Sequence, residues 1–142
     1  MKYDLNWLIE KYNNGERLKY LFFWGHQPRK DGSIGDSCFS QWWQSAFTVD
    51  GTEYKTAEHW MMAQKARLFN DEETLAKIIA AKTPAEAKKL GRAVRNFNPA
   101  QWDAHKYAFV KIGNVHKFSQ HADLKAYLLT TGDLVIVEAS PV

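Results

Sequence analysis

Residues 56–65 read Thr-Ala-Glu-His-Trp-Met-Met-Ala-Gln-Lys, and this stretch decides how the chain folds. Asp50-Gly51 lies just before it, between two alternating segments at 45–49 and 52–55. Asp-Gly between alternating segments is the strongest short-range signal for a β-hairpin. Thr56 is a good N-cap residue. The sequence therefore predicts a hairpin that leads directly into a central helix over 56–69.

The predicted central helix carries charge on one face. At about 3.6 residues per turn, Glu58, Met62 and Lys65 fall on the same side. A carboxylate and an ammonium among Met and Trp side chains are unusual for a core helix. The arrangement suits a pocket that holds a polar ligand.

Capping residues and apolar periodicity predict the other elements. Thr83-Pro84-Ala85-Glu86 is a helix start signal, and Asn98-Pro99 begins a longer helix. The pattern indicates a helix-dominated α+β single domain with a small, mostly antiparallel sheet, in which residues 1–17 form an N-terminal helical extension. Helices are expected over 4–14, 70–81, 83–91, 98–118 and 120–130, strands over 18–24 and 134–138, and a loop over 27–37.

Composition sets limits on the class of protein. The 142 residues are 45% hydrophobic and 25% charged, which indicates one folded domain and excludes a disordered chain. A net charge of +3 tolerates phosphate or nucleic acid as a partner without requiring either. Cys38 has no second cysteine to pair with, and no apolar run is long enough for a signal peptide or membrane span. A soluble, cytoplasmic protein with no membrane partner is expected.

Several motifs together resemble the NADAR family, the YbiA-like N-glycosidases. Their order and spacing extend over roughly residues 20 to 140. The matching blocks are Phe39-Ser40 before the hairpin, Thr56-x-Glu58-His59 with Gln64-Lys65, Gly91-Arg92, Trp102 four residues after Asn98, Lys117-Phe118-x-Gln120-His121-x-Asp123-Leu124, and Leu134-Val135 with Glu138.

The resemblance implies hydrolysis of N-glycosidic bonds. It implies removal of ribose 5-phosphate from the first intermediates of riboflavin synthesis, and, for some members, removal of ADP-ribose from modified guanine in DNA. The family continues into an Asp-x-x-Trp-Gly motif whose Asp is held to be catalytic. This chain ends at 140–142, where that motif should begin. We expect a truncated chain, the alternative being a protein that ends naturally without the motif, and both interpretations put its own catalysis in question.

Glu58 is the candidate catalytic carboxylate. Cleavage at an anomeric carbon develops positive charge on the sugar, which a carboxylate can stabilise while it orients a water. Burial in a ring-lined pocket would raise the pKa of Glu58, and Lys65 would lower it. The alternative is a first-turn carboxylate favoured only by the helix dipole.

Trp102, Trp42, Lys65 and Arg92 are the candidate substrate-binding residues. Trp102 is predicted to stack on the base, unless it is a core residue that anchors its helix. Trp42 and Trp43 are adjacent, so at most one can face the pocket. Lys65 and Arg92 are predicted to hold phosphate, although either could be a surface charge and Lys65 could instead pair with Glu58.

No cofactor or metal is expected. Glu58-His59 lacks the second histidine four residues away that a zinc helix needs, and His59 is expected to be a hydrogen-bonded structural residue. Two functions remain open: an N-glycosidase acting on a small ribosyl-phosphate or ADP-ribosyl substrate, including one in modified nucleic acid, and a non-catalytic module that binds ADP-ribose or a nucleobase. Whether Asp123, Asp133 or Glu138 replaces the missing acid also stays open, as does the oligomeric state.

Overall fold

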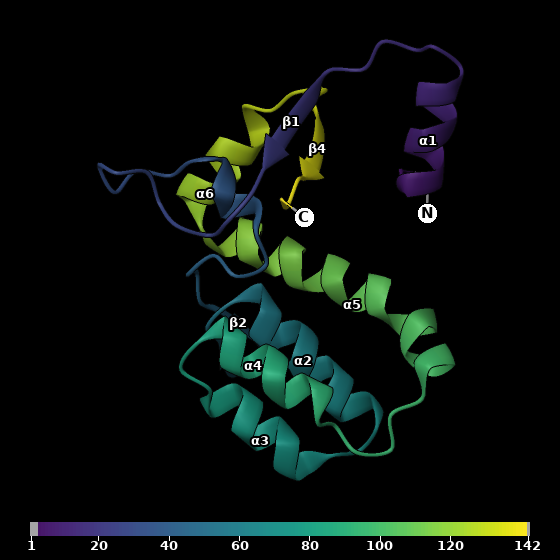
Figure 1. Cartoon of the computed structure of the whole chain (residues 1–142). Helices are drawn as coiled ribbons and strands as arrows, with labels where there is room; N and C mark the ends of the chain where they lie inside the picture. The colour runs from purple at the N-terminus through teal and green to yellow at the C-terminus, as the bar shows by residue number, and fades with distance from the viewer. Residues whose placement is uncertain (1–2, 142) are drawn as a thin grey trace.

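The computed structural model describes residues 3–141. Helices dominate this part of the chain, and its strands form two separate pairs (Figure 1). The predicted helix-dominated α+β class is confirmed. The elements in chain order are α1 (Leu5–Asn13), β1 (Tyr20–Phe23), the 3₁₀ helix η1 (Asp36–Phe39), β2 (Phe47–Val49), β3 (Thr52–Tyr54), α2 (Ala57–Leu68), α3 (Glu72–Ala80), α4 (Pro84–Arg92), α5 (Pro99–Gln120), α6 (Ala122–Leu129) and β4 (Val135–Glu138).

The hairpin β2–β3 forms where Asp-Gly predicts it. Asp50 and Gly51 have φ angles of 49° and 79°, the left-handed conformation that a tight hairpin turn requires. Phe47 pairs with Tyr54 across the ladder, and both side chains are buried. The turn therefore fixes the register that places two aromatic rings in the core beside α2.

Helix α2 begins at a fully satisfied cap. The Thr56 hydroxyl accepts a hydrogen bond from the backbone N–H of His59 at 3.3 Å, and it lies 2.8 Å from His59 Nδ1. His59 Nε2 lies 2.9 Å from the Ala81 carbonyl, which can only accept, so Nε2 carries the proton and the hydroxyl donates to Nδ1. Burial lowers the pKa of His59. The predicted structural role of this histidine is confirmed.

Helices α3, α4 and α5 pack around α2, and glycines permit the close approach. A Cβ added at Gly91 of α4 would lie 2.0 Å from Met62 Sδ, and one added at Gly113 of α5 would lie 2.3 Å from Trp60 Cδ1. Figure 1 shows α5 running between the layer of α2, α3 and α4 and the strands β1 and β4. The short contacts fix how deeply α2 sits between its neighbours.

Strands β1 and β4 join the two ends of the chain. They are parallel, and Tyr20 pairs with Val135 and Phe23 with Glu138. The sequence suggested a mostly antiparallel sheet, whereas the strands divide evenly between one antiparallel and one parallel pair. A second apolar cluster lies next to β1 and β4 and contains Cys38, Phe39, Trp43 and Leu124. The segment between η1 and β2 therefore lies between the strands and α2.

Candidate active site

Glu58 lies in the first turn of α2 and is only 7% exposed. Its backbone N–H donates to the Gln41 carbonyl at 3.0 Å, so the segment after η1 lies against the start of the helix. A first-turn carboxylate whose only role is to interact with the helix dipole does not require burial. The side chain is withdrawn from bulk water, as the proposed role requires.

Three segments of the chain contribute charge or hydrogen bonding to the Glu58 carboxyl. Burial is the largest influence and raises its pKa above the ordinary value for glutamate. Lys88, a side-chain hydrogen bond with Trp42, and Arg92 oppose this rise, whereas the negative charge of Glu138 adds to it. The site is thus a buried acid with two cations, an indole and a second acid around it.

Trp42 faces this site, and Trp43 does not. Trp43 is buried in the second apolar cluster, while Trp42 is half-buried. Lys88 Nζ lies 5.8 Å from the centroid of the Trp42 ring, and His26 packs edge-on against the same ring at 5.4 Å between centroids. The structure therefore places Trp42 beside Glu58 and Trp43 in the core, and a substrate contact by Trp42 stays a prediction.

Arg92 and Lys65 lie close enough to influence each other. Burial lowers the pKa of Lys65, and the charge of Arg92 lowers it further. Lys65 Nζ lies 4.3 Å from the centroid of the Phe97 ring, and within residues 3–141 it forms no ion pair with Glu58 or another acid. The ion-pair alternative for Lys65 is not supported. Arg92 acts on both Glu58 and Lys65, so a row of cations extends from the acid.

Trp102 lies in the core. The sequence left two roles open for it, stacking on a base and anchoring its helix. It is 8% exposed and stacks on Phe109 at 6.1 Å between centroids. Lys65 Nζ lies 5.8 Å from its ring, so the indole borders the row of cations. Stacking of a substrate base on Trp102 stays a prediction.

Lys88 is the residue at the site that the sequence did not single out. It lies on the polar side of an amphipathic helix, which looks like a solvated face in the sequence alone. Its spacing is the available signal, since Lys88 and Arg92 are four apart on α4 and share a helix face.

Among the three acids considered as replacements, Glu138 acts on Glu58. It ends β4 and is exposed. Asp123 accepts a hydrogen bond from the Leu124 N–H at 2.8 Å, and Asp133 precedes the other end of β4. Of the three acids, Glu138 is the one whose charge influences the pKa of Glu58, and its role as a second acid stays a prediction.

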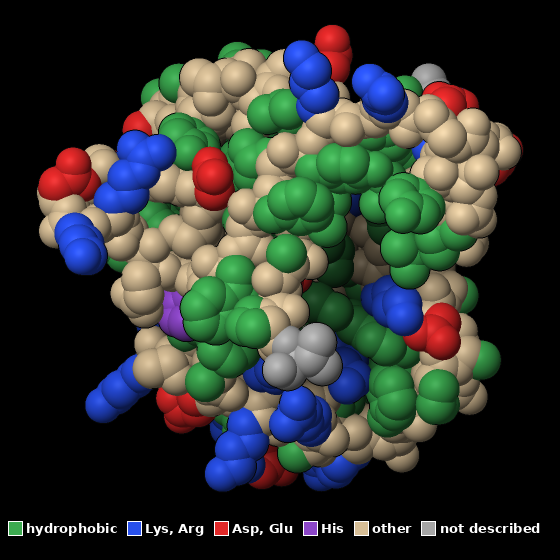
Figure 2. Space-filling view, turned by 45° about the horizontal axis from the view of Figure 1, so that its top comes forward, with side chains coloured by type: hydrophobic (Ala, Val, Ile, Leu, Met, Phe, Trp, Pro, Cys, Tyr) green, Lys and Arg blue, Asp and Glu red, His purple; other side chains and the backbone are tan. Residues whose placement is uncertain are grey.

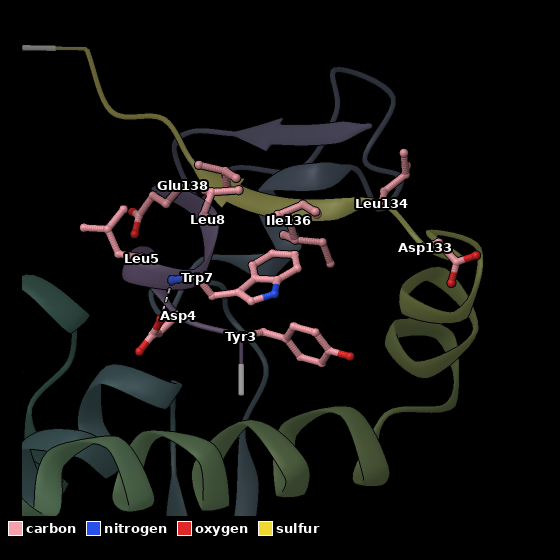
Figure 3. A pocket seen from close by; sticks show the side chains of 11 residues that line it. Tyr3, Asp4, Leu5, Trp7, Leu8, Asp133, Leu134, Ile136 and Glu138 are labelled. Carbon is pink, nitrogen blue, oxygen red and sulfur yellow. Dashed lines mark hydrogen bonds between the residues drawn. The ribbon is translucent and has the colours of Figure 1, made fainter. Parts of the chain in front are cut away.

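A cavity of about 700 Å³ adjoins the site between α1 and β4. Figure 3 shows Trp7 and Tyr3 on one side of β4, with Glu138 and Asp133 at opposite ends of the strand. Glu138 belongs to the lining, whereas Glu58 does not. On the face in Figure 2, Lys and Arg side chains gather beside a hollow bordered by hydrophobic ones. An anionic group of a ligand would find favourable charge on this face.

Residues 3–141 contain no group of three or more metal-ligating side chains placed to hold an ion. Over the same residues, no helix has the length and apolar character needed to cross a bilayer.

The NADAR domain model matches residues 22–142. This chain belongs to the NADAR domain family. N-glycosidase R617 of Acanthamoeba polyphaga mimivirus is 46% identical over 131 residues, which cover 89% of this chain and 75% of the viral protein. The NMR structure of E. coli YbiA superimposes with a TM-score of 0.68 at 29% identity, covering 87% of this chain and 70% of that one.

A third relative has a more specific name. Riboflavin biosynthesis protein VVA0006 of Vibrio vulnificus is 30% identical over 95 residues, which are 67% of this chain and 25% of that protein. The predicted family is confirmed, and N-glycosidase is supported as the general class of activity. The individual site residues and the substrate stay predictions.

Proposed function

We propose that this NADAR domain hydrolyses the N-glycosidic bond of a phosphorylated ribosyl base or an ADP-ribosyl base, with Glu58 as its catalytic carboxylate. The observation that supports this most directly is a buried acid beside Lys88, Arg92 and the Trp42 indole. The names of the relatives support the general class. The riboflavin-related name of one relative favours a ribosyl phosphate attached to a pyrimidine-type base.

In the proposed reaction, the bond between the anomeric carbon and the base nitrogen breaks, and its electron pair leaves with the base. Water adds to the carbon and loses a proton to Glu58, and the base nitrogen takes up a proton from solvent. Glu58 then returns its proton to solvent. The ionised Glu58 also stabilises the positive charge that develops on the sugar. Because the carboxyl must be ionised, we expect the rate to rise with pH through a midpoint above the ordinary glutamate value of about 4.3.

The cations beside the acid fit a substrate phosphate. Lys88 and Arg92 are exposed on α4, so their charges are free to contact an anion, and Arg92 extends the positive charge towards Lys65. An arginine can hold phosphate in two parallel hydrogen bonds. A ribosyl phosphate would place its anomeric carbon near Glu58 and its phosphate on these residues.

Glu58→Gln tests the acid. The substitution keeps size and polarity but removes the base, and we expect release of ribose 5-phosphate to stop while the fold is retained. Glu53→Gln is the matched control because Glu53 is exposed on β3. Chromatographic detection of the free sugar phosphate from riboflavin-pathway intermediates, and of ADP-ribose from modified guanine, gives the readout. Normal turnover by Glu58→Gln would show that another group does the chemistry.

Lys88→Met tests the phosphate contact, with its exposed neighbour Lys89→Met as control. A hydrogen bond to a charged group contributes about 1.5–3 kcal/mol, so KM for the phosphorylated substrate should rise about tenfold or more. Equal KM values in the two variants would remove Lys88 from the site. Calorimetry with ADP-ribose on the wild-type chain completes the test, since binding without product would favour the non-catalytic module.

A further inference from the structure

Lys117 is a lysine buried in α5 without a carboxylate partner. Its exposed fraction is 0%, and within residues 3–141 it takes part in no ion pair. Burial lowers its pKa to about 8, and burial raises the pKa of the nearby Cys38 thiol to about 11. Cys38 is therefore a neutral thiol at neutral pH and does not balance the charge. A buried, unpaired ammonium is unfavourable, so its hydrogen bonds must compensate.

Both hydrogen bonds go to one short segment. Lys117 Nζ donates to the Cys38 carbonyl at 2.6 Å and to the Ser40 carbonyl at 2.9 Å. The Ser40 carbonyl also accepts the Trp43 N–H at 3.2 Å, and the Ser40 hydroxyl accepts the Trp42 N–H at 3.1 Å. The ammonium thus binds the turn that determines which way Trp42 and Trp43 point.

Asn114 holds the same segment one helical turn earlier. Its amide exchanges hydrogen bonds with the Gln41 side chain at 3.1 and 3.2 Å, and it donates to the Val110 carbonyl at 2.9 Å. Asn114 and Lys117 are three residues apart, so they share one face of α5. Helix α5 therefore contacts the segment from Cys38 to Gln41 through three of its polar groups.

This segment also forms one wall of the candidate active site. The Gln41 carbonyl accepts the Glu58 N–H at 3.0 Å, and the Trp42 side chain lies close enough to the Glu58 carboxyl to lower its pKa. We propose that Lys117 is a positioning residue, whose ammonium holds the turn at Ser40 so that Trp42 covers the Glu58 carboxyl. The proposal rests on the function given above for Glu58. Because Lys117 is fully buried, it cannot itself contact a substrate.

The test is Lys117→Met, which keeps the length of the side chain but removes both hydrogen bonds. Lys111→Met is the matched control because Lys111 is exposed on the same helix. The readout is the carboxyl ¹³C titration of Glu58, assigned by comparison with Glu58→Gln. Lys88, Arg92 and Glu138 are the charged groups that influence this carboxyl, and all three are unchanged in both variants.

Loosening the segment admits water to Glu58, which lowers its pKa, and withdraws Trp42, which raises it. Burial is the largest influence on this pKa, so the loss of burial decides the direction. We therefore expect the titration midpoint in Lys117→Met to fall from its raised position towards the ordinary glutamate value of about 4.3. On a cleaved substrate, kcat should fall about tenfold with KM nearly unchanged, as for loss of an interaction made in the transition state. Lys111→Met should match the wild type in both measurements.

A folded Lys117→Met whose Glu58 midpoint equals that of the wild type would overturn the proposal, because lost stability alone does not move this midpoint. If Lys117→Met does not fold, Asn114→Ala removes the other contact and should lower the midpoint in the same direction by a smaller amount. No change in Asn114→Ala would then overturn the proposal. The titration needs no substrate, so it still decides the role of Lys117 if the wild-type chain shows no turnover and the proposed function fails.

Discussion

Replacing Gly91 by alanine tests how closely α4, which carries Lys88 and Arg92, must approach α2. The added Cβ would lie 2.0 Å from Met62 Sδ, 2.8 Å from Cγ and 3.2 Å from Cβ. Non-bonded carbon atoms separate to about 3.5–4.0 Å. The thioether end of Met62 can rotate away, but its Cβ is fixed to α2, so the helices must also move apart.

Two opposing contributions determine the size of the effect. Overpacking a core contact costs about 1–3 kcal/mol. Alanine is better than glycine in a helix interior by about 1 kcal/mol, which offsets part of that cost. We expect Gly91→Ala to lower the free energy of unfolding by up to about 2 kcal/mol, and to weaken phosphate binding because α4 is displaced from Glu58.

Urea unfolding of a double-mutant cycle separates the two contributions. Met62→Ala removes Sδ and Cγ, the two closest atoms, and itself costs about 2–5 kcal/mol through the cavity it leaves. In that background Gly91→Ala should become neutral or stabilising by about 1 kcal/mol, because only the helix preference remains. If Gly91→Ala stabilises both backgrounds equally, the close packing of α4 on α2 is wrong.

Three further predictions concern stability. Gly113→Ala should lower the free energy of unfolding in urea more than Gly91→Ala does, because the added Cβ would meet the rigid Trp60 indole. An equal or smaller loss of stability would argue against the tight α2–α5 contact. Glu58→Gln should raise Tm at pH 7 relative to wild type. The pKa of Glu58 is raised in the folded state, so ionisation of this carboxyl lowers the stability of the wild type as pH rises above the unfolded-state pKa. The gain in Tm should vanish below about pH 4, and a gain that persists there has another cause. Asp71→Asn should lower Tm at pH 7, because hydrogen bonds from Arg95 hold the pKa of Asp71 well below its usual range. The difference in Tm between variant and wild type should shrink as pH falls through that depressed pKa. A pH-independent difference would contradict an electrostatic origin.

Local chemistry explains why much of the fold was predictable from the sequence. The Asp50-Gly51 turn and the caps at Thr56, Thr83 and Asn98 act within a few residues, and each forms where expected. The parallel pairing of β1 with β4 was not predictable in this way. It depends on residues more than one hundred positions apart, and the alternation of a short strand does not reveal the direction of its partner.

The same division applies to the site. The helix start and the alternation of neighbouring side chains predict Glu58 and Trp42 as site residues, and the structure places the two near each other. Lys88 was missed because its approach to Glu58 depends on the packing of α4 on α2, which no local pattern encodes. Trp102 is a residue that the sequence singles out without deciding its role. An aromatic residue at the start of a helix looks the same in sequence whether it packs in a core or binds a base.

The pairing of Phe23 with Glu138 has a consequence for biosynthesis. The acid that influences Glu58 reaches its place only when β1 and β4, more than one hundred residues apart, meet. Closing so long a loop carries an entropic cost that local helices do not bear. On the ribosome, α2, α3 and α4 can assemble while residue 138 is still inside the exit tunnel. The electrostatic environment of Glu58 is therefore completed only after residue 138 has left the tunnel.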